Sequence, residues 1–336
     1  MSVSMVFVIG APRSGTTMLE RMLSSHSQIQ GGPEPHLLTP LAHLGPWATV
    51  DKAPYDHVLA AESQKAFIAE LPGKESDYWR ACRAYCDVLY GGYMQGRDKK
   101  ICLDKTPAYG LILPFMMKVF PDAKYVVITR HPLAMFSSFA NSFFDGRYDV
   151  AHTYNPIINR YVPALAAFLR QSAVPFIHVR YEDLVKEPEQ GFAQICAHIG
   201  VGYEPEAINY GANEDEARRS GLGDPLGVQQ HGRPTTASVK KWVQELKHDQ
   251  EKRALMERVI AQLDPADLAT LGYPLETLWK PLAEAGDVAP PTAPGFNRYR
   301  LQRKVIVELR AQAQKGGAFR KALEKVRLTA DVLLRE

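Results

Sequence analysis

Cysteine, net charge and long apolar runs are all scarce in this sequence of 336 residues, and each scarcity excludes a class of protein. The four cysteines lack the second Cys or His cluster that would complete a zinc site, so we expect no metal and interpret them as buried or free thiols. The 40 basic and 37 acidic residues leave a net charge of only +3. Because binding to a phosphate backbone requires concentrated basic surface, we expect no nucleic-acid partner, while a local anion site remains compatible with the composition.

The apolar runs are too short for a membrane span or a secretion signal. None reaches the roughly 18 residues that a helix needs to cross a bilayer. The apolar segment 5–10 is shorter than the core of a signal peptide, and no basic region precedes it. We therefore expect no integral membrane segment and, as the default, a reduced, cytoplasmic location.

Four short apolar runs predict the strands of a parallel sheet. They are Val3–Gly10, Lys99–Leu103, Lys124–Thr129 and Phe176–Val179. Segments with helical spacing of apolar residues follow or separate them, at 14–25, 63–93, 132–144 and 151–171. Strands that alternate with helices build a parallel sheet that is covered on both faces. The predicted fold is therefore α/β, a single P-loop-like domain with a central parallel sheet flanked by helices.

The last part of the chain contains a proline-rich break. Residues 285–295 read AGDVAPPTAPG, which is typical of a linker. We therefore predict a domain over 1–284, a Pro-rich linker over 285–295 and a basic helical C-terminal extension over 296–336. The extension would either support a homodimer or brace the domain. A Gly- and Pro-rich segment at 213–238 is interpreted as a long loop with a binding or covering role.

The turn between the first predicted strand and its helix, GAPRSGTT, has the features of a phosphate cradle. The free N–H groups of a helix N-terminus and the helix dipole both favour a bound anion. Gly15 lets the backbone approach that anion closely, and Arg13 adds a full positive charge. Hydroxyl donors come from Ser14, Thr16 and Thr17.

This turn differs from the P-loop of nucleoside triphosphatases. Gly10 and Gly15 have the GxxxxG spacing, but the motif then requires Lys followed by Ser or Thr. Thr16 stands at the position of that Lys, and no Mg²⁺-binding carboxylate is recognised. A P-loop kinase is therefore a weaker alternative. A non-catalytic nucleotide-binding scaffold, with the basic extension as its interaction module, is another.

A second anion-binding signal follows the third predicted strand, in RHPLAMFSS. Arg130 stands at the carboxyl end of that strand, where α/β sheets bind ligands, and Ser138 lies two helical turns further on. Together these side chains could grip a phosphate. Two anion sites after two strands predict a ligand that carries two separated phosphates.

These segments together resemble the sulfotransferases that use 3′-phosphoadenosine-5′-phosphosulfate (PAPS). The PRSGTT segment is similar to their 5′-phosphosulfate loop, and its Arg13 form looks closer to the bacterial and tyrosylprotein branch. Arg130 and Ser138 match the Arg and Ser of their 3′-phosphate motif. Tyr181 begins a YEDL segment similar to one whose Tyr lies near the adenine. The resemblance covers roughly residues 5–245.

The resemblance implies a donor, a reaction and site residues. PAPS would be the sulfuryl donor and 3′,5′-ADP the product, and no metal would be needed. The loop residues Ser14, Gly15, Thr16 and Thr17 would hold the 5′-phosphate, and Arg130 with Ser138 the 3′-phosphate. In the Arg-type branch a Glu about twenty residues after the loop Arg is the base, and Glu34 stands twenty-one residues after Arg13.

Three further assignments belong to this reading. Lys105, in a DKTP segment, matches the Lys that helps Arg13 stabilise the transferring group. His36 is an alternative base, because the pKa of imidazole suits proton transfer near neutral pH. Arg233, in a GRPTT segment, would contact the nucleotide or else be a solvated loop residue. We expect O-sulfation of a small-molecule or lipid acceptor, because no secretory segment points to a Golgi-type acceptor.

Overall fold

The computed structural model describes residues 3–32, 34–44, 57–212 and 232–286, together with separate positions between 304 and 326. Of the predicted loop at 213–238, residues 213–231 lie outside the described part of the chain. Of the predicted linker at 285–295, residues 287–295 lie outside it. The division into domain, linker and extension therefore stays a prediction.

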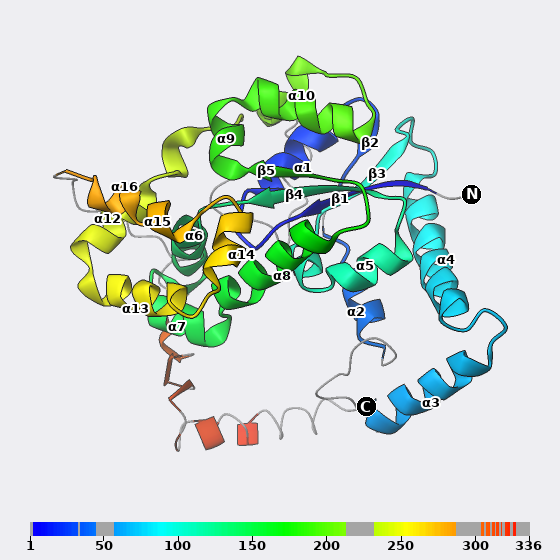
Figure 1. Ribbon diagram of the computed structural model, residues 1–336, viewed down its shortest axis with the longest axis horizontal. Coiled ribbons are helices and arrows are strands. Elements are labelled where there is room, and N and C mark those ends of the chain that lie inside the picture. The colour runs from blue at the N-terminus through cyan, green and yellow to red at the C-terminus, as the bar shows by residue number, and fades with distance from the viewer. Residues whose placement is uncertain are drawn as a thin grey trace.

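Five parallel strands form one sheet in the order β2-β3-β1-β4-β5 (Figure 1). Their bounds are Ser4–Ile9 (β1), Ile29–Gln30 (β2), Ile101–Asp104 (β3), Lys124–Thr129 (β4) and Phe176–Arg180 (β5). The predicted α/β fold with a central parallel sheet is confirmed. β2 has no counterpart in the sequence prediction, because two residues are too few to produce a recognisable pattern.

Helices cover both faces of this sheet. Up to the fourth strand they are α1 (Thr16–Ser24), α2 (Leu38–Ala42), α3 (His57–Glu70), α4 (Glu75–Met94), η1 (Pro107–Leu111) and α5 (Leu113–Val119). Then come α6 (Pro132–Phe144), α7 (Tyr148–Tyr154), α8 (Ile157–Gln171), α9 (Tyr181–Lys186), α10 (Pro188–Ile199), η2 (Pro205–Ile208) and η3 (Tyr210–Ala212). The last group is η5 (Thr236–Ser238), α12 (Lys241–His248), α13 (Gln250–Ile260), α14 (Pro265–Thr270), α15 (Leu275–Leu278) and α16 (Lys280–Ala283).

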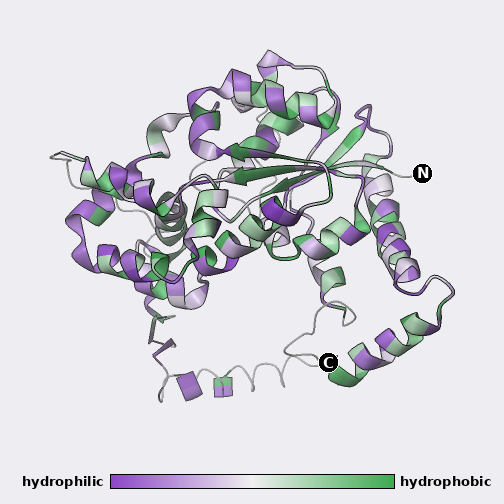
Figure 2. Cartoon of the chain, in the orientation of Figure 1, coloured by the Kyte–Doolittle hydropathy of each residue, from purple (hydrophilic) through white to green (hydrophobic). Residues whose placement is uncertain are grey.

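The side chains of the central strands alternate between two apolar cores. In β1, Phe7 and Ile9 join a core with residues of α4, α5, α6, α8 and the later helices, whereas Val6 and Val8 join a core with α1, α9 and α10. All four are buried, so the strand is apolar without a break, as expected for a sheet covered on both faces. Figure 2 shows this apolar centre as green strands surrounded by helices with hydrophilic segments.

Two predicted helical segments are each divided. The segment 63–93 is broken at 71–74 between α3 and α4, where the sequence LPGK contains two helix breakers and Lys74 has a φ of 48°. The segment 151–171 is broken between α7 and α8, where Asn155 precedes Pro156 in extended geometry. None of the helices within the described ranges has the length and apolar character that crossing a membrane requires.

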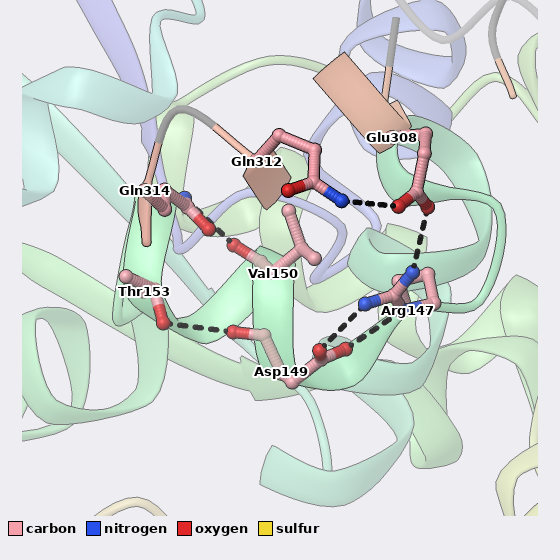
Figure 3. A network of polar contacts seen from close by, with 7 residues as sticks. All are labelled: Arg147, Asp149, Val150, Thr153, Glu308, Gln312 and Gln314. Atoms are coloured by element: carbon pink, nitrogen blue, oxygen red, sulfur yellow. Dashed lines mark hydrogen bonds and ion pairs between the residues drawn. The ribbon is translucent and has the colours of Figure 1, made fainter. Parts of the chain in front are cut away.

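The described part of the C-terminal extension packs on α7 of the same chain. Val307 and Ala311 are buried in the larger core. Around them, Glu308 accepts a hydrogen bond from Arg147 at 3.2 Å, and the Gln314 amide donates to the carbonyl of Val150 at 3.4 Å (Figure 3). These contacts fit the bracing alternative and leave the homodimer alternative untested.

Candidate active site

The topology gathers the sequence-predicted residues at one edge of the sheet. β1 lies between β3 and β4, so the chain order reverses beside β1, and ligands of α/β sheets bind at such a switch point. The anion loop follows β1, and Arg130 follows the neighbouring β4. Lys105 follows β3, and Tyr181 follows β5. All four segments therefore begin at the carboxyl edge of the sheet.

The loop after β1 is shaped by its two glycines. Gly15 has a φ of 99°, and a Cβ at this position would lie 2.4 Å from Cδ2 of Tyr181. A Cβ on Gly10 would lie 2.5 Å from the Oγ of Ser14. That Oγ is buried and has no hydrogen-bond partner in the described part of the chain. Since the first N–H groups of a helix also lack intrahelical partners, this loop leaves several donors for an anion.

Arg130 connects the loop to two other segments. Its Nη1 donates to the carbonyl oxygen of Arg13 at 3.0 Å, and its Nη2 donates to the carbonyl oxygen of Ser238 at 2.9 Å. Its guanidinium stands 4.5 Å from the ring centroid of Tyr181, whose hydroxyl pairs with Ser238 Oγ at 2.8 Å. The Nε of Arg13 donates to Ser138 Oγ at 3.1 Å. The predicted nucleotide residues of three strand ends are therefore in direct contact.

The charge of Arg130 is buried, which is costly without an anion. Burial lowers the pKa of its guanidinium, and its Nε is buried with no hydrogen-bond partner among the described residues. Its hydrogen-bond acceptors in this structure are carbonyl oxygens. A bound phosphate would compensate this buried charge and occupy the remaining donor.

Lys105 connects the loop to the predicted base. Its ammonium group donates to Glu34 Oε1 and lies 3.4 Å from the hydroxyl of Thr17. The Lys105 side chain is 4% exposed and that of Glu34 is 17% exposed. His36 Nε2 lies 3.6 Å from the other oxygen of Glu34, on a side chain that is 45% exposed. The carboxylate therefore lies between a buried cation and a more exposed imidazole.

Asp104, immediately before Lys105, is a buried carboxyl group that the sequence analysis did not single out. It is 1% exposed and accepts hydrogen bonds from Tyr90 at 2.5 Å, Tyr109 at 3.0 Å and Thr106 at 3.0 Å. Burial raises the pKa of this carboxyl to about 6, although the three hydroxyl donors oppose the shift. The signal in the sequence that could have identified Asp104 is a carboxylate at the end of an otherwise apolar strand.

Arg233 lies apart from these contacts in this structure. Its Nη2 donates to Glu189 Oε1 of α10 at 3.0 Å, and both side chains are exposed. A role in nucleotide binding stays a prediction for this residue. Ser238, five residues later, was missed although it contacts both Arg130 and Tyr181. Its surroundings in the sequence, a run of Thr and Ser, carry no anion-binding pattern.

The raised pKa of Asp104 makes the stability of the protein depend on pH. The folded carboxyl binds its proton more tightly than the unfolded one, so its contribution is complete below pH 3.8 and is lost as the pH rises through about 6. We expect the unfolding free energy of the wild type, relative to Asp104→Asn, to fall by about 2 kcal/mol from pH 4 to pH 7. Chemical denaturation of both proteins across this range measures the difference, and a pH-independent difference contradicts the assignment.

Comparison with known proteins places the chain in a family. Nodulation protein NoeE of Sinorhizobium fredii is 27% identical over 290 residues, which cover 80% of this chain but only 65% of that protein, just under two thirds of its length. Protein-tyrosine sulfotransferase 1 of Danio rerio is 22% identical over 291 residues, covering 80% of this chain and 72% of that protein. The omega-hydroxy-beta-dihydromenaquinone-9 sulfotransferase of Mycobacterium tuberculosis is 27% identical over 122 residues, which cover 32% of this chain and 30% of that protein.

Within the described residues, no group of three or more His, Cys, Asp or Glu side chains is arranged to hold a metal ion. The four cysteines are buried free thiols.

A model of the sulfotransferase family matches residues 5–205, which include the anion loop, Glu34, Lys105, Arg130 and Tyr181. Because this match spans more than half of the chain, the protein belongs to the sulfotransferase family.

Proposed function

We propose that the enzyme transfers the sulfuryl group of PAPS to a hydroxyl group of a small-molecule or lipid acceptor. One observation carries the proposal: the Lys105 ammonium group bridges the anion loop, through Thr17, and the carboxylate of Glu34. A donor phosphate held by the loop and an acceptor hydroxyl next to Glu34 would then be separated by a single cation. A cation beside both groups can stabilise the charge that develops during an in-line group transfer.

The residues present fit PAPS as the donor. The unpartnered Oγ of Ser14 and the first N–H groups of α1 suit the 5′-phosphate, with Thr16 and Thr17 beside them. The buried guanidinium of Arg130, together with Ser138, suits the 3′-phosphate. The Tyr181 ring packs against Gly15 of the anion loop and suits contact with the adenine. Two separate anion sites favour this donor over ATP or 5′-AMP.

The protein side of the reaction follows from these positions. PAPS supplies a sulfuryl group bound to a phosphate that is a good leaving group. Glu34 accepts the proton of the acceptor hydroxyl as the new oxygen–sulfur bond forms. Arg13 and Lys105 stabilise the negative charge that develops on the sulfuryl oxygens and on the departing phosphate. In this way the side chains of the protein supply the positive charge at the reacting centre.

The names of two relatives support a hydroxyl acceptor. A protein-tyrosine sulfotransferase acts on tyrosine, which offers a phenolic hydroxyl, and the mycobacterial relative is named for an ω-hydroxy menaquinone. The second name also supports a lipid as one acceptor class.

Thermal unfolding with 3′,5′-ADP tests the donor site. A ligand at 100 times its Kd stabilises the folded state by about 2.7 kcal/mol, so we expect a clear rise in Tm. The rise should be smaller with 5′-AMP, which lacks the 3′-phosphate. Arg130→Ala is expected to weaken 3′,5′-ADP binding by about 10- to 100-fold, the loss typical of a charge-assisted hydrogen bond.

The control for this experiment is Arg253→Ala, which removes an exposed guanidinium paired with Glu257 on α13. Equal loss of 3′,5′-ADP binding in both variants would contradict the assignment of Arg130 to the 3′-phosphate. No shift with 3′,5′-ADP but a Mg²⁺-dependent shift with ATP would favour the kinase alternative and refute the proposed donor.

A further inference from the structure

We infer that Tyr109 is a positioning residue that fixes the predicted base Glu34 relative to Lys105. The inference rests on the proposed function, because it assigns the purpose of the Tyr109 hydroxyl from the roles of those two residues. In the described part of the chain, the Tyr109 hydroxyl makes no hydrogen bond to the side chain of Glu34 or of Lys105. Tyr109 therefore acts on them through the backbone.

One end of this connection is the carboxyl group of Asp104. Asp104 is the last residue of β3 and is covalently adjacent to Lys105, so any contact that fixes Asp104 also fixes the start of the Lys105 segment. Three hydroxyl groups donate to this carboxyl, from Tyr90 of α4 and from Thr106 and Tyr109 on the strand's own continuation. A buried carboxyl group with three donors is held in one orientation.

The other end is the segment that carries Glu34. The hydroxyl of Tyr109 donates to Asp104 and also accepts the backbone N–H of Leu38 at 3.2 Å. Leu38 is the first residue of α2 and follows Glu34 by four positions. Its N–H is one of those that a helix cannot satisfy internally, so the hydroxyl fixes the beginning of α2.

The short segment from Glu34 to Leu38 is itself constrained. His36 has a φ of 53°, in the left-handed region that non-glycine residues rarely adopt. Tyr109 itself is completely buried, so its hydroxyl cannot be replaced by solvent without a rearrangement. A side chain that links the Leu38 end of this strained segment to Asp104, the neighbour of Lys105, restricts where Glu34 lies relative to the Lys105 ammonium group.

Tyr90 offers a matched control. Its hydroxyl donates to the same Asp104 carboxyl, and it is also buried, but it comes from α4 and shares no described hydrogen bond with the segment 34–38. Tyr90→Phe and Tyr109→Phe therefore each remove one donor from Asp104. Only Tyr109→Phe also leaves the Leu38 N–H without its acceptor.

The experiment compares the two variants in a steady-state PAPS assay and in 3′,5′-ADP binding. We expect the larger loss of stability from Tyr109→Phe, which removes two hydrogen bonds, and a fall in kcat of about 10- to 100-fold only for that variant, the scale of a small misplacement of a catalytic group. The KM for PAPS and the affinity for 3′,5′-ADP should stay within about twofold, because the phosphate contacts are elsewhere. A combined Tyr109→Phe and Tyr90→Phe variant should retain the kcat of Tyr109→Phe.

Equal kcat for the two variants, or a loss confined to nucleotide affinity, would overturn the positioning role. The same assay with Glu34→Gln separates this failure from failure of the proposed function. An inactive Glu34→Gln beside a fully active Tyr109→Phe refutes only the inference about Tyr109. A fully active Glu34→Gln refutes the proposed base and the inference built on it.

Discussion

Glu34→Gln is expected to lower kcat by about 10²- to 10⁴-fold, the range that a positioned general base contributes. Glutamine keeps the shape of the side chain and one oxygen for the Lys105 ammonium group, but it cannot accept the proton of an acceptor hydroxyl. The fold should survive, since Glu34 is partly exposed and Thr17 also lies next to Lys105. Turnover of PAPS with an active acceptor measures kcat, and 3′,5′-ADP binding should be unchanged.

His36→Ala decides between the two candidate bases. The imidazole lies 3.6 Å from Glu34 and is 45% exposed, so its removal should change kcat by only a few fold if Glu34 is the base. A large loss in His36→Ala together with an active Glu34→Gln would exchange the two roles. Loss of activity in both variants would indicate that the pair acts as one unit.

The sequence predicted the fold because the strands are buried on both faces. The run KYVVIT at 124–129 is apolar without interruption from Tyr125 to Ile128, and its bounds agree with β4. The anion loop was recognisable because a Gly-containing turn between a strand and a helix is combined there with Arg13 and three hydroxyl residues. Arg130 followed from the strand pattern, whereas Lys105 and Tyr181 were assigned from the resemblance to the sulfotransferases.

Contacts that bring distant segments together could not be read from the sequence. Ser238 approaches Arg130 across 108 positions, and Tyr109 meets Leu38 across 71 positions, in both cases through backbone groups. Backbone groups are the same in every residue, so no pattern of side chains marks these partners. The break in the segment 63–93 was visible as Pro72 and Gly73, but its helical periodicity on both sides concealed it.

Lys105→Met is expected to lower kcat by about 10²- to 10³-fold, the loss that follows removal of one preorganised group that stabilises developing charge. Methionine preserves the unbranched stem in a position that is only 4% exposed, so packing should be retained. Thr17→Val removes only the hydroxyl that Lys105 approaches at 3.4 Å, and it should have a smaller effect. Lys118→Met, at a solvent-facing position of α5, is the control for loss of a positive charge.

The combination of Lys105→Met with Glu34→Gln tests whether the two residues share one transition state. If the cation stabilises charge that appears only as Glu34 removes the acceptor proton, the second substitution should cost far less in the first variant than in the wild type. Fully additive losses would mean that the two groups act in separate steps. An active Lys105→Met, with kcat unchanged, would limit the ion pair to a structural role and leave Arg13 as the cation of the reaction.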